Sequence, residues 1–169
     1  MKYKLTDVKI NFMGKTLFQI EAVKCFGDIV KGQKGGFIEK ESNLSQFCNA
    51  WVHGNAKVYG DAWVYGNAWV SGDAKVHGNA WVHGNAKVYG DAWVSGDADY
   101  LVIGPIGSRN DITTFFKTAN NDIKVSCGCF TGNIEEFLEK VNETHGNNNY
   151  AKEYKTAVEI AKIHIFGGE

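Results

Sequence analysis

Arg109 is the residue of this 169-residue chain whose type and surroundings most favour ligand chemistry. It is the only arginine among the 18 lysines and arginines, and it follows the stretch Gly104–Gly107. A guanidinium group binds phosphate or carboxylate in a bidentate manner, and the backbone amides of a flexible turn can bind the same anion. We therefore predict that Ser108, Arg109 and Asn110 bind an anionic ligand. The alternative is a domain linker that carries an ordinary surface arginine.

Histidines and cysteines are the other side chains with catalytic or metal-binding chemistry. His53, His77 and His83 share one position of a six-residue repeat that Tyr or Ser occupies elsewhere, which favours an outer surface position over a single general base. Cys127 and Cys129 are separated by one residue, which is too few for the usual zinc pair. On a strand, their sulfurs would lie on one face. We therefore predict free thiols, and neither a catalytic residue nor a metal or cofactor.

The composition is that of a folded chain without a strong charge bias. Apolar residues make up 44%, and 18 basic and 19 acidic side chains leave a net charge of -1. This balance gives no general attraction to nucleic acid or to anionic membranes. Neither a secretory signal nor an apolar run of the ~18 residues that a membrane span needs is visible. The sequence thus predicts a cytoplasmic protein.

Residues 52–99 form eight consecutive hexads in the middle of the chain. Val opens each hexad, Gly is third, Asn or Asp fourth and Ala fifth, and the sixth residue is Trp or Lys until Asp99 ends the tract. The residues around each Val alternate between apolar and polar with the period of a strand. Gly followed by Asn or Asp tolerates the positive φ of a tight corner. One strand and one corner per hexad close a triangular coil after three hexads, with Val and Ala inside.

The tract resembles the hexapeptide-repeat family of left-handed parallel β-helices, in which an aliphatic residue opens each hexad and a small residue is fifth. The resemblance implies a mainly β fold. Further residues extend the inward columns at six-residue steps: Ile38, Leu44, Ala50, Tyr100 and Ile106. We therefore predict a left-handed β-helix, or hexapeptide solenoid, over residues 34–106, with about four turns.

Flanking segments are predicted to cover the ends of the solenoid, because stacked repeats leave strand edges exposed. Residues 1–33 are typical of an N-terminal β-hairpin cap with its turn at Met13–Lys15. Residues 107–169 are typical of a small α+β module of two strands and two helices, the first helix opening at the capping-box pair Asn133 and Glu136. The two predicted strands are 112–117 and 123–129. The second helix carries one apolar stripe: Tyr150, Tyr154, Val158, Ala161 and Ile165.

Segments at both ends of the tract look like those of hexapeptide-repeat proteins from bacteriophages and prophages. Gly35–Lys40 and Asn43–Ser45 resemble the entry segment of such proteins. Gly107–Asp111 and Cys127–Gly132 resemble a tail module that often accompanies it. The resemblance covers nearly the whole chain and implies a small phage-encoded protein of the host cytoplasm. Some small phage proteins counter host defence.

Stacking every third hexad places five tryptophans on the outer surface of the predicted coil. Such a large apolar exposure favours subunit contacts, and the resemblance also implies trimers that associate through their sides. The predicted interface residues are Trp51, Trp63, Tyr65, Trp69, Trp81 and Trp93. As an alternative, the same rings form a platform for a ligand. The predicted platform residues are Trp63, Trp81 and His83.

The leading hypothesis is a non-enzymatic, homotrimeric binding protein of phage type. It would counter host defence by sequestering a small anionic ligand such as a signalling nucleotide, or by binding a host protein. A second hypothesis is a hexapeptide-type acyltransferase that uses acyl-coenzyme A, because the resembling acetyltransferases use a histidine as general base. Those enzymes often have a loop that interrupts the hexads, and this tract has none. A third hypothesis is a structural component of the virion or its assembly.

Overall fold

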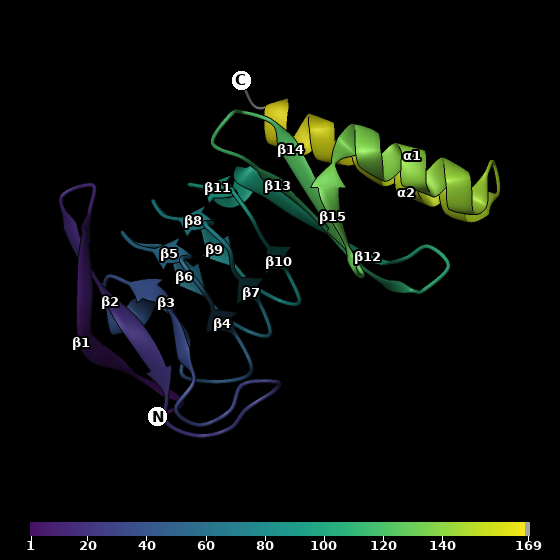
Figure 1. Cartoon of the computed structure of the whole chain (residues 1–169). Helices are drawn as coiled ribbons and strands as arrows, with labels where there is room; N and C mark the ends of the chain where they lie inside the picture. The colour runs from purple at the N-terminus through teal and green to yellow at the C-terminus, as the bar shows by residue number, and fades with distance from the viewer. Residues whose placement is uncertain (168–169) are drawn as a thin grey trace. The chain divides into compact units, whose positions relative to one another are not determined.

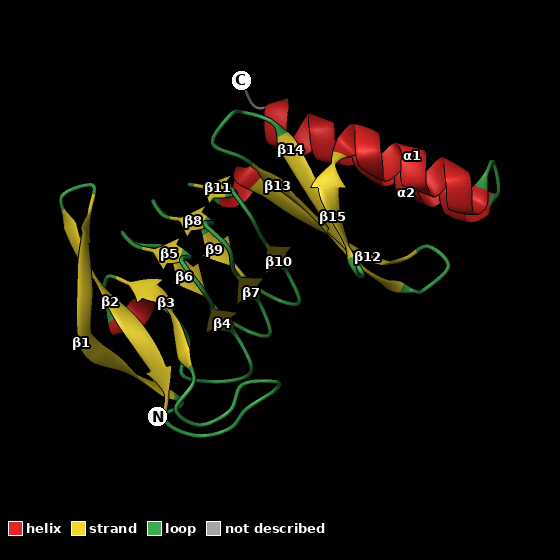
Figure 2. Ribbon diagram, in the orientation of Figure 1, coloured by secondary structure: helices red, strands yellow, loops and turns green. Residues whose placement is uncertain are grey.

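The computed structural model describes residues 1–167, which divide into two compact units (Figure 1). The N-terminal unit spans Met1–Asp97, and the C-terminal unit begins at Ala98. The first consists mainly of strands and turns, and the second combines a sheet with two helices (Figure 2). Neither of these helices, over the residues described, is long and apolar enough to cross a membrane.

A β-solenoid of about three turns forms the body of the N-terminal unit. Its short strands begin every six residues, as the hexads predict. They are β4 (Trp51–Val52), β5 (Lys57–Val58), β6 (Trp63–Val64), β7 (Trp69–Val70), β8 (Lys75–Val76), β9 (Trp81–Val82), β10 (Lys87–Val88) and β11 (Trp93–Val94). Parallel pairing between successive turns joins β4-β7-β10, β5-β8-β11 and β6-β9. The parallel β-helix is therefore confirmed, and its left-handed sense stays a prediction.

Val and Ala side chains fill the interior of the solenoid. All eight hexad valines are fully buried, and so are the inward residues Ile38, Leu44 and Ala50 of the predicted backward extension. The first seven hexad glycines turn the corners with φ between 63° and 71°. They stack closely, since a Cβ added to Gly66 would lie 3.1 Å from the backbone nitrogen of Gly84. The predicted division into inward and outward positions is confirmed for these columns.

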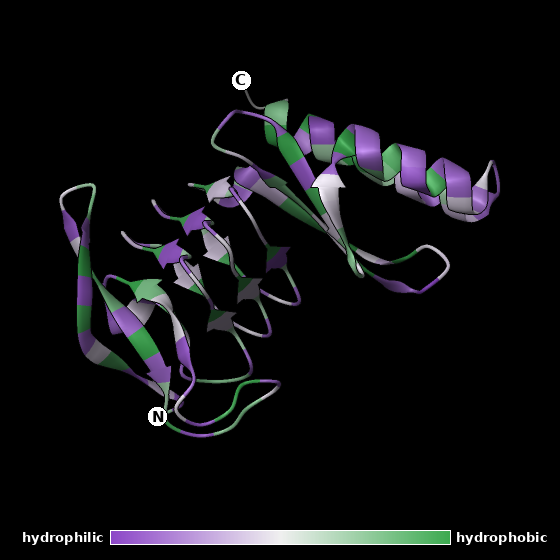
Figure 3. Cartoon of the chain, in the orientation of Figure 1, coloured by the Kyte–Doolittle hydropathy of each residue, from purple (hydrophilic) through white to green (hydrophobic). Residues whose placement is uncertain are grey.

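An antiparallel hairpin precedes the solenoid, as predicted. It consists of β1 (Tyr3–Phe12) and β2 (Lys15–Ala22), and its turn uses positive φ at Met13 (49°) and Gly14 (76°). Figure 3 shows hydrophobic and hydrophilic residues alternating along both strands. β2 pairs with β3 (Lys34–Ile38), and β3 pairs in parallel with β5. The hairpin thus continues one sheet of the solenoid and covers its open strand edge.

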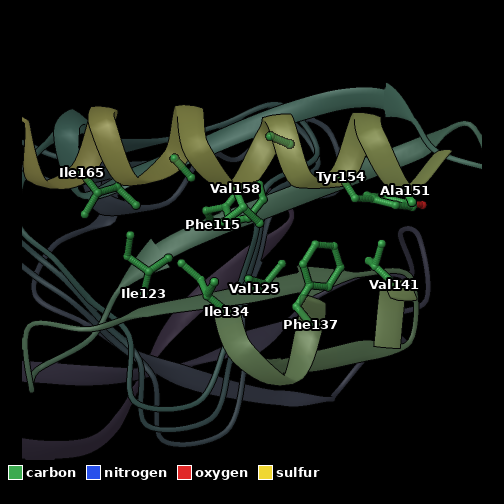
Figure 4. Packing of buried hydrophobic residues seen from close by; sticks show 12 residues of the cluster. Phe115, Ile123, Val125, Ile134, Phe137, Val141, Ala151, Tyr154, Val158 and Ile165 are labelled. Atoms are coloured by element: carbon green, nitrogen blue, oxygen red, sulfur yellow. The ribbon is translucent and has the colours of Figure 1, made fainter. Parts of the chain in front are cut away.

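The C-terminal unit is an antiparallel sheet in the order β12-β13-β14-β15 packed against two helices. The strands are β12 (Tyr100–Ile106), β13 (Asp111–Lys117), β14 (Ile123–Cys127) and β15 (Phe130–Asn133), and the helices are α1 (Ile134–His145) and α2 (Asn149–Phe166). Its core includes Phe115, Val125 and Phe137 (Figure 4). The capping box is confirmed: the Asn133 side chain accepts a hydrogen bond from Glu136 N, and the Glu136 carboxylate accepts one from Asn133 N.

The extent of the solenoid differs from the sequence prediction. β12 pairs with β13 in the antiparallel sheet, with Tyr100 opposite Phe116, so residues 100–106 do not form a further solenoid turn. The predicted solenoid ends after residue 106 and so includes β12. In the structure, the solenoid strands end with β11, before β12 begins. Residues six apart also lie on the same face of an ordinary strand. The six-residue step from Tyr100 to Ile106 is therefore compatible with β12 as well as with a solenoid turn.

Two details of the C-terminal module also differ from the prediction. The predicted strand 123–129 is two elements, because Gly128 adopts φ 60° and reverses the chain between β14 and β15. Cys129 therefore lies in a turn, so Cys127 and Cys129 do not share one face of a single strand, contrary to the sequence prediction. Tyr150 is 44% exposed, whereas the other members of the predicted α2 stripe are buried.

Candidate functional site

A pocket of about 350 Å³ in the C-terminal unit contains Arg109, the residue predicted to bind an anion. The β12–β13 turn, the β14–β15 turn, α1 and the first part of α2 contribute its walls. The lining residues are Arg109, Cys127, Cys129, Phe130, Phe137, Lys140, Val141, Thr144, His145 and Tyr154. Its volume falls within the roughly 300–1,000 Å³ of small-molecule sites.

Two glycines make room for the turn that carries Arg109. Asn110 adopts φ 47°, and its N–H donates to the Gly107 carbonyl at 3.1 Å. Gly107 itself has φ 70°, and a Cβ there would overlap the Tyr154 hydroxyl. A Cβ on Gly128 would lie 2.9 Å from Arg109 Nη1. The absence of a Cβ at Gly128 thus lets the guanidinium lie beside the β14–β15 turn.

Tyr154 forms one side of the pocket and is only 5% exposed. Burial raises the pKa of its phenol to about 12, with help from the Cys127 thiol and from Glu153, while Arg109 acts in the opposite direction. The hydroxyl is therefore protonated at neutral pH and remains uncharged. The Cys127 sulfur, which also lines the pocket, accepts a hydrogen bond from Thr113 Oγ1 at 3.2 Å.

Aromatic rings line the apolar part of the pocket. The ring centroids of Phe130 and Phe137 are 5.4 Å apart, and Phe137 meets Tyr154 edge to face at 5.5 Å. The His145 ring lies 5.9 Å from that of Tyr154. Ring faces of this kind stack with planar groups of a ligand.

The charged side chains that line the pocket are basic. Arg109 and Lys140 carry positive charges, and the imidazole of His145 lines the pocket from the last turn of α1. None of the ten lining residues, all within the described chain, is Asp or Glu. Lys140 pairs with Glu143 at 3.2 Å, but the two side chains are 65% and 69% exposed, so this ion pair is weak. The site therefore favours an anion.

Sequence reasoning found one of the residues that form this pocket. Arg109 lines it, whereas Ser108 and Asn110 lie exposed in the same turn and do not. Phe130, Lys140, His145 and Tyr154 were not predicted as ligand contacts. The sequence did indicate part of this site. The two segments that resemble the phage tail module both contribute lining residues to the pocket: Gly107–Asp111 and Cys127–Gly132.

The tryptophans of the solenoid differ in exposure although the hexads give them equivalent positions. Trp51 is fully buried, because Phe26 and Tyr3 cover its outward side with rings 5.4 and 6.4 Å away, and it is therefore not exposed for a subunit contact. Trp63 and Trp81 are 36% and 50% exposed. The interface and platform roles of the remaining residues stay predictions: Trp63, Tyr65, Trp69, Trp81, His83 and Trp93.

Comparison with protein-family models and with curated protein sequences found no match to the chain. The hexapeptide family and the phage origin implied by resemblance therefore stay predictions. The function is inferred from the chemistry of the pocket itself.

Proposed function

We propose that the C-terminal unit is a non-enzymatic binding module for a small molecule that carries an anionic group and a planar ring, such as a nucleotide. One observation carries this proposal. The side chains of Arg109, Lys140 and His145 line an aromatic pocket that has no acidic lining residue. A phosphate would bind the guanidinium and ammonium groups, and the ring would stack on Phe130. The neutral hydroxyl of Tyr154 offers a further hydrogen bond.

Sequestration is the activity that such a binder would have in a cell. A protein that binds a nucleotide without converting it lowers the free concentration of that nucleotide in proportion to its own abundance. For a phage-encoded protein, as the resemblance implies, the target would be a host signalling nucleotide. Binding of a host protein is the alternative target, and homotrimeric assembly stays a prediction.

The solenoid histidines support a packing role more than the acyltransferase alternative. His77 stacks on Tyr59 and His83 on Tyr65, each with ring centroids 5.1 Å apart, and His53 stacks on an indole of the next turn. A histidine that stacks on an aromatic ring of a neighbouring turn thus occurs on each of the three faces. An acyltransferase needs one histidine with distinct surroundings as its general base.

Calorimetry on the full chain tests the proposal with nucleoside mono- and diphosphates and cyclic nucleotides, and with the parent nucleosides as uncharged controls. Arg109→Ala should weaken nucleotide binding by roughly 10- to 100-fold with an almost unchanged melting temperature, because it removes a charge-assisted bidentate contact. Arg109→Lys should restore only part of the affinity. Lys162→Ala removes an equal charge from α2 outside the pocket and should leave binding unchanged.

Two results would contradict the proposal. One is a nucleotide that binds Arg109→Ala as tightly as the wild-type protein, which would place its site elsewhere. The other is a panel in which nucleosides bind as well as nucleotides, because the basic side chains would then contribute nothing to recognition.

A further inference from the structure

An open groove of about 610 Å³ lies in the N-terminal unit, on the face of the solenoid formed by β6 and β9. The 3-10 turn η1 (Glu41–Asn43) and the loop after it line one side, and the two strands line the other. The lining residues include Glu41, Ser42, Phe47, Asp61, Trp63 and Trp81. This groove and the Arg109 pocket belong to different units of the chain.

The N-terminal segment leaves the β6–β9 face open while it covers the first turn of the other two. The segment around Phe26 buries Trp51 on the β4 face. The hairpin tip covers Tyr59 on the β5 face, where Phe12 lies 5.7 Å from the Tyr59 ring and Met13 Sδ accepts a bond from its hydroxyl. Within Met1–Asp97, no such segment covers the groove face. Its exposed rings are Trp63 (36%), Trp81 (50%) and Phe47 (80%).

The two indoles of the groove form a right-angled corner. The Trp63 and Trp81 rings are 5.8 Å apart with an interplanar angle of 86°. Tyr65 stacks on Trp63 at 4.2 Å and supports it. The backbone of Phe47 is held by Ser45, since the Phe47 N–H donates to Ser45 Oγ at 3.1 Å. One flat apolar surface and one apolar wall are therefore presented to solvent, a shape that fits the C–H face of a pyranose ring.

Polar side chains surround this aromatic corner. Asp61 is 87% exposed and accepts a hydrogen bond from Lys40 through Oδ1, which leaves Oδ2 for other donors. Glu41 and Ser42 are also exposed on the wall of the groove. Carboxylates accept and hydroxyls both donate and accept, so these groups match the hydroxyls of a sugar.

We propose that this groove binds a neutral saccharide. Two carboxylates against one ammonium disfavour an anionic ligand such as a nucleotide or a nucleic acid. A second copy of the chain is also disfavoured, because the centre of a protein interface is depleted of charged side chains. Covering Glu41 and Asp61 with an apolar surface would bury their charges, whereas sugar hydroxyls would hydrogen-bond to them.

Titration of the full chain with neutral hexasaccharides of glucose and of N-acetylglucosamine tests the proposal, by calorimetry and by tryptophan fluorescence. Trp81→Lys should fold, because the hexads carry Lys at this position elsewhere, and it should weaken binding by roughly tenfold or more. Trp93→Lys makes the same exchange on another face and serves as the matched control, with unchanged affinity. Phe47→Ala alters the groove without changing the solenoid and should also weaken binding.

The proposal is supported if a neutral hexasaccharide binds, if Trp81→Lys and Phe47→Ala weaken this binding, and if Trp93→Lys leaves it unchanged. Failure of every neutral probe overturns it, and so does a preference for sulfated or uronic-acid hexasaccharides. Light scattering that shows a wild-type oligomer dispersed by Trp81→Lys would assign the face to a second copy and overturn it as well. Because nucleotide binding is measured separately, either site can fail without the other.

Discussion

Replacement of Trp51 by lysine separates the hexad pattern from the structure, because the two predict opposite results. Either Trp or Lys precedes each hexad valine, so the repeat alone predicts that the chain tolerates the exchange. In the structure Trp51 is fully buried against Phe26 and Tyr3. Its indole also packs on the backbone at Gly35, where an added Cβ would lie 2.7 Å from it. A lysine in this position would place an ammonium group in an apolar enclosure.

The expected magnitudes follow from this burial. Truncation of a buried tryptophan costs about 3–5 kcal/mol, so Trp51→Lys should lower the free energy of unfolding of the N-terminal unit by at least about 3 kcal/mol. Trp51→Phe should cost under about 2 kcal/mol, because Trp51 Nε1 has no hydrogen-bond partner in the described structure and its loss removes an unsatisfied buried donor. Trp81→Lys, at a half-exposed side chain, should stay within about 0.5 kcal/mol of the wild type.

Urea denaturation followed by circular dichroism measures these differences, with the denaturant slope checked for each variant. Equal stability of Trp51→Lys and Trp81→Lys would refute the conclusion that the N-terminal segment buries one tryptophan and leaves the other open. A loss in Trp51→Phe as large as that in Trp51→Lys would refute the argument from the unsatisfied indole nitrogen.

Burial lowers the pKa of Lys2 from 10.5 to about 8, although its ammonium donates to the Ala50 carbonyl at 2.7 Å. Between these two pKa values the unfolded chain binds more protons than the folded chain, so the free energy of unfolding should rise with pH. Urea titrations at several pH values should show this rise, and Lys2→Met should lack it; equal pH slopes would count against the shift. Gly128→Ala should weaken nucleotide binding in calorimetry, because its Cβ would displace the Arg109 guanidinium. Gly14→Ala is the control: it also places Ala at positive φ, but no atom lies within 4 Å of the added Cβ. It should cost a similar ~1 kcal/mol of stability and leave nucleotide binding intact. Unchanged nucleotide binding in Gly128→Ala would contradict the reasoning.

The solenoid could be predicted from the sequence because its structure is local and repeated. Each hexad contains both its strand and its corner, so the period of Val and the position of Gly determine which residues point inward. The partner of a strand is not local information. Residues 100–106 therefore fitted the hexad spacing, although β12 pairs with β13 in the other unit. The burial of Trp51 likewise depends on contacts with Tyr3 and Phe26, which no repeat encodes.

The Arg109 pocket was predictable only in part for the same physical reason. A single arginine after a glycine-containing turn is visible in the sequence, and it does line the pocket. Lys140 and His145 join it because α1 follows β15 and packs against β14 and β15, and this packing is tertiary structure. Tyr154 was predicted as a core residue of α2, and it both belongs to the core and lines the pocket.

Net charge describes this chain poorly because its basic and acidic groups are distributed unevenly over two candidate sites. The overall charge of -1 predicts no general attraction to anions, yet Arg109 and Lys140 line a pocket that has no Asp or Glu among its lining residues. The solenoid groove has the opposite balance, with Glu41 and Asp61 near Lys40. Charge interactions with an exposed site weaken with ionic strength, whereas stacking and hydrogen bonds to uncharged hydroxyls depend on it little. The salt dependence of binding therefore identifies which site a ligand occupies, even for a ligand that carries both a sugar and a phosphate.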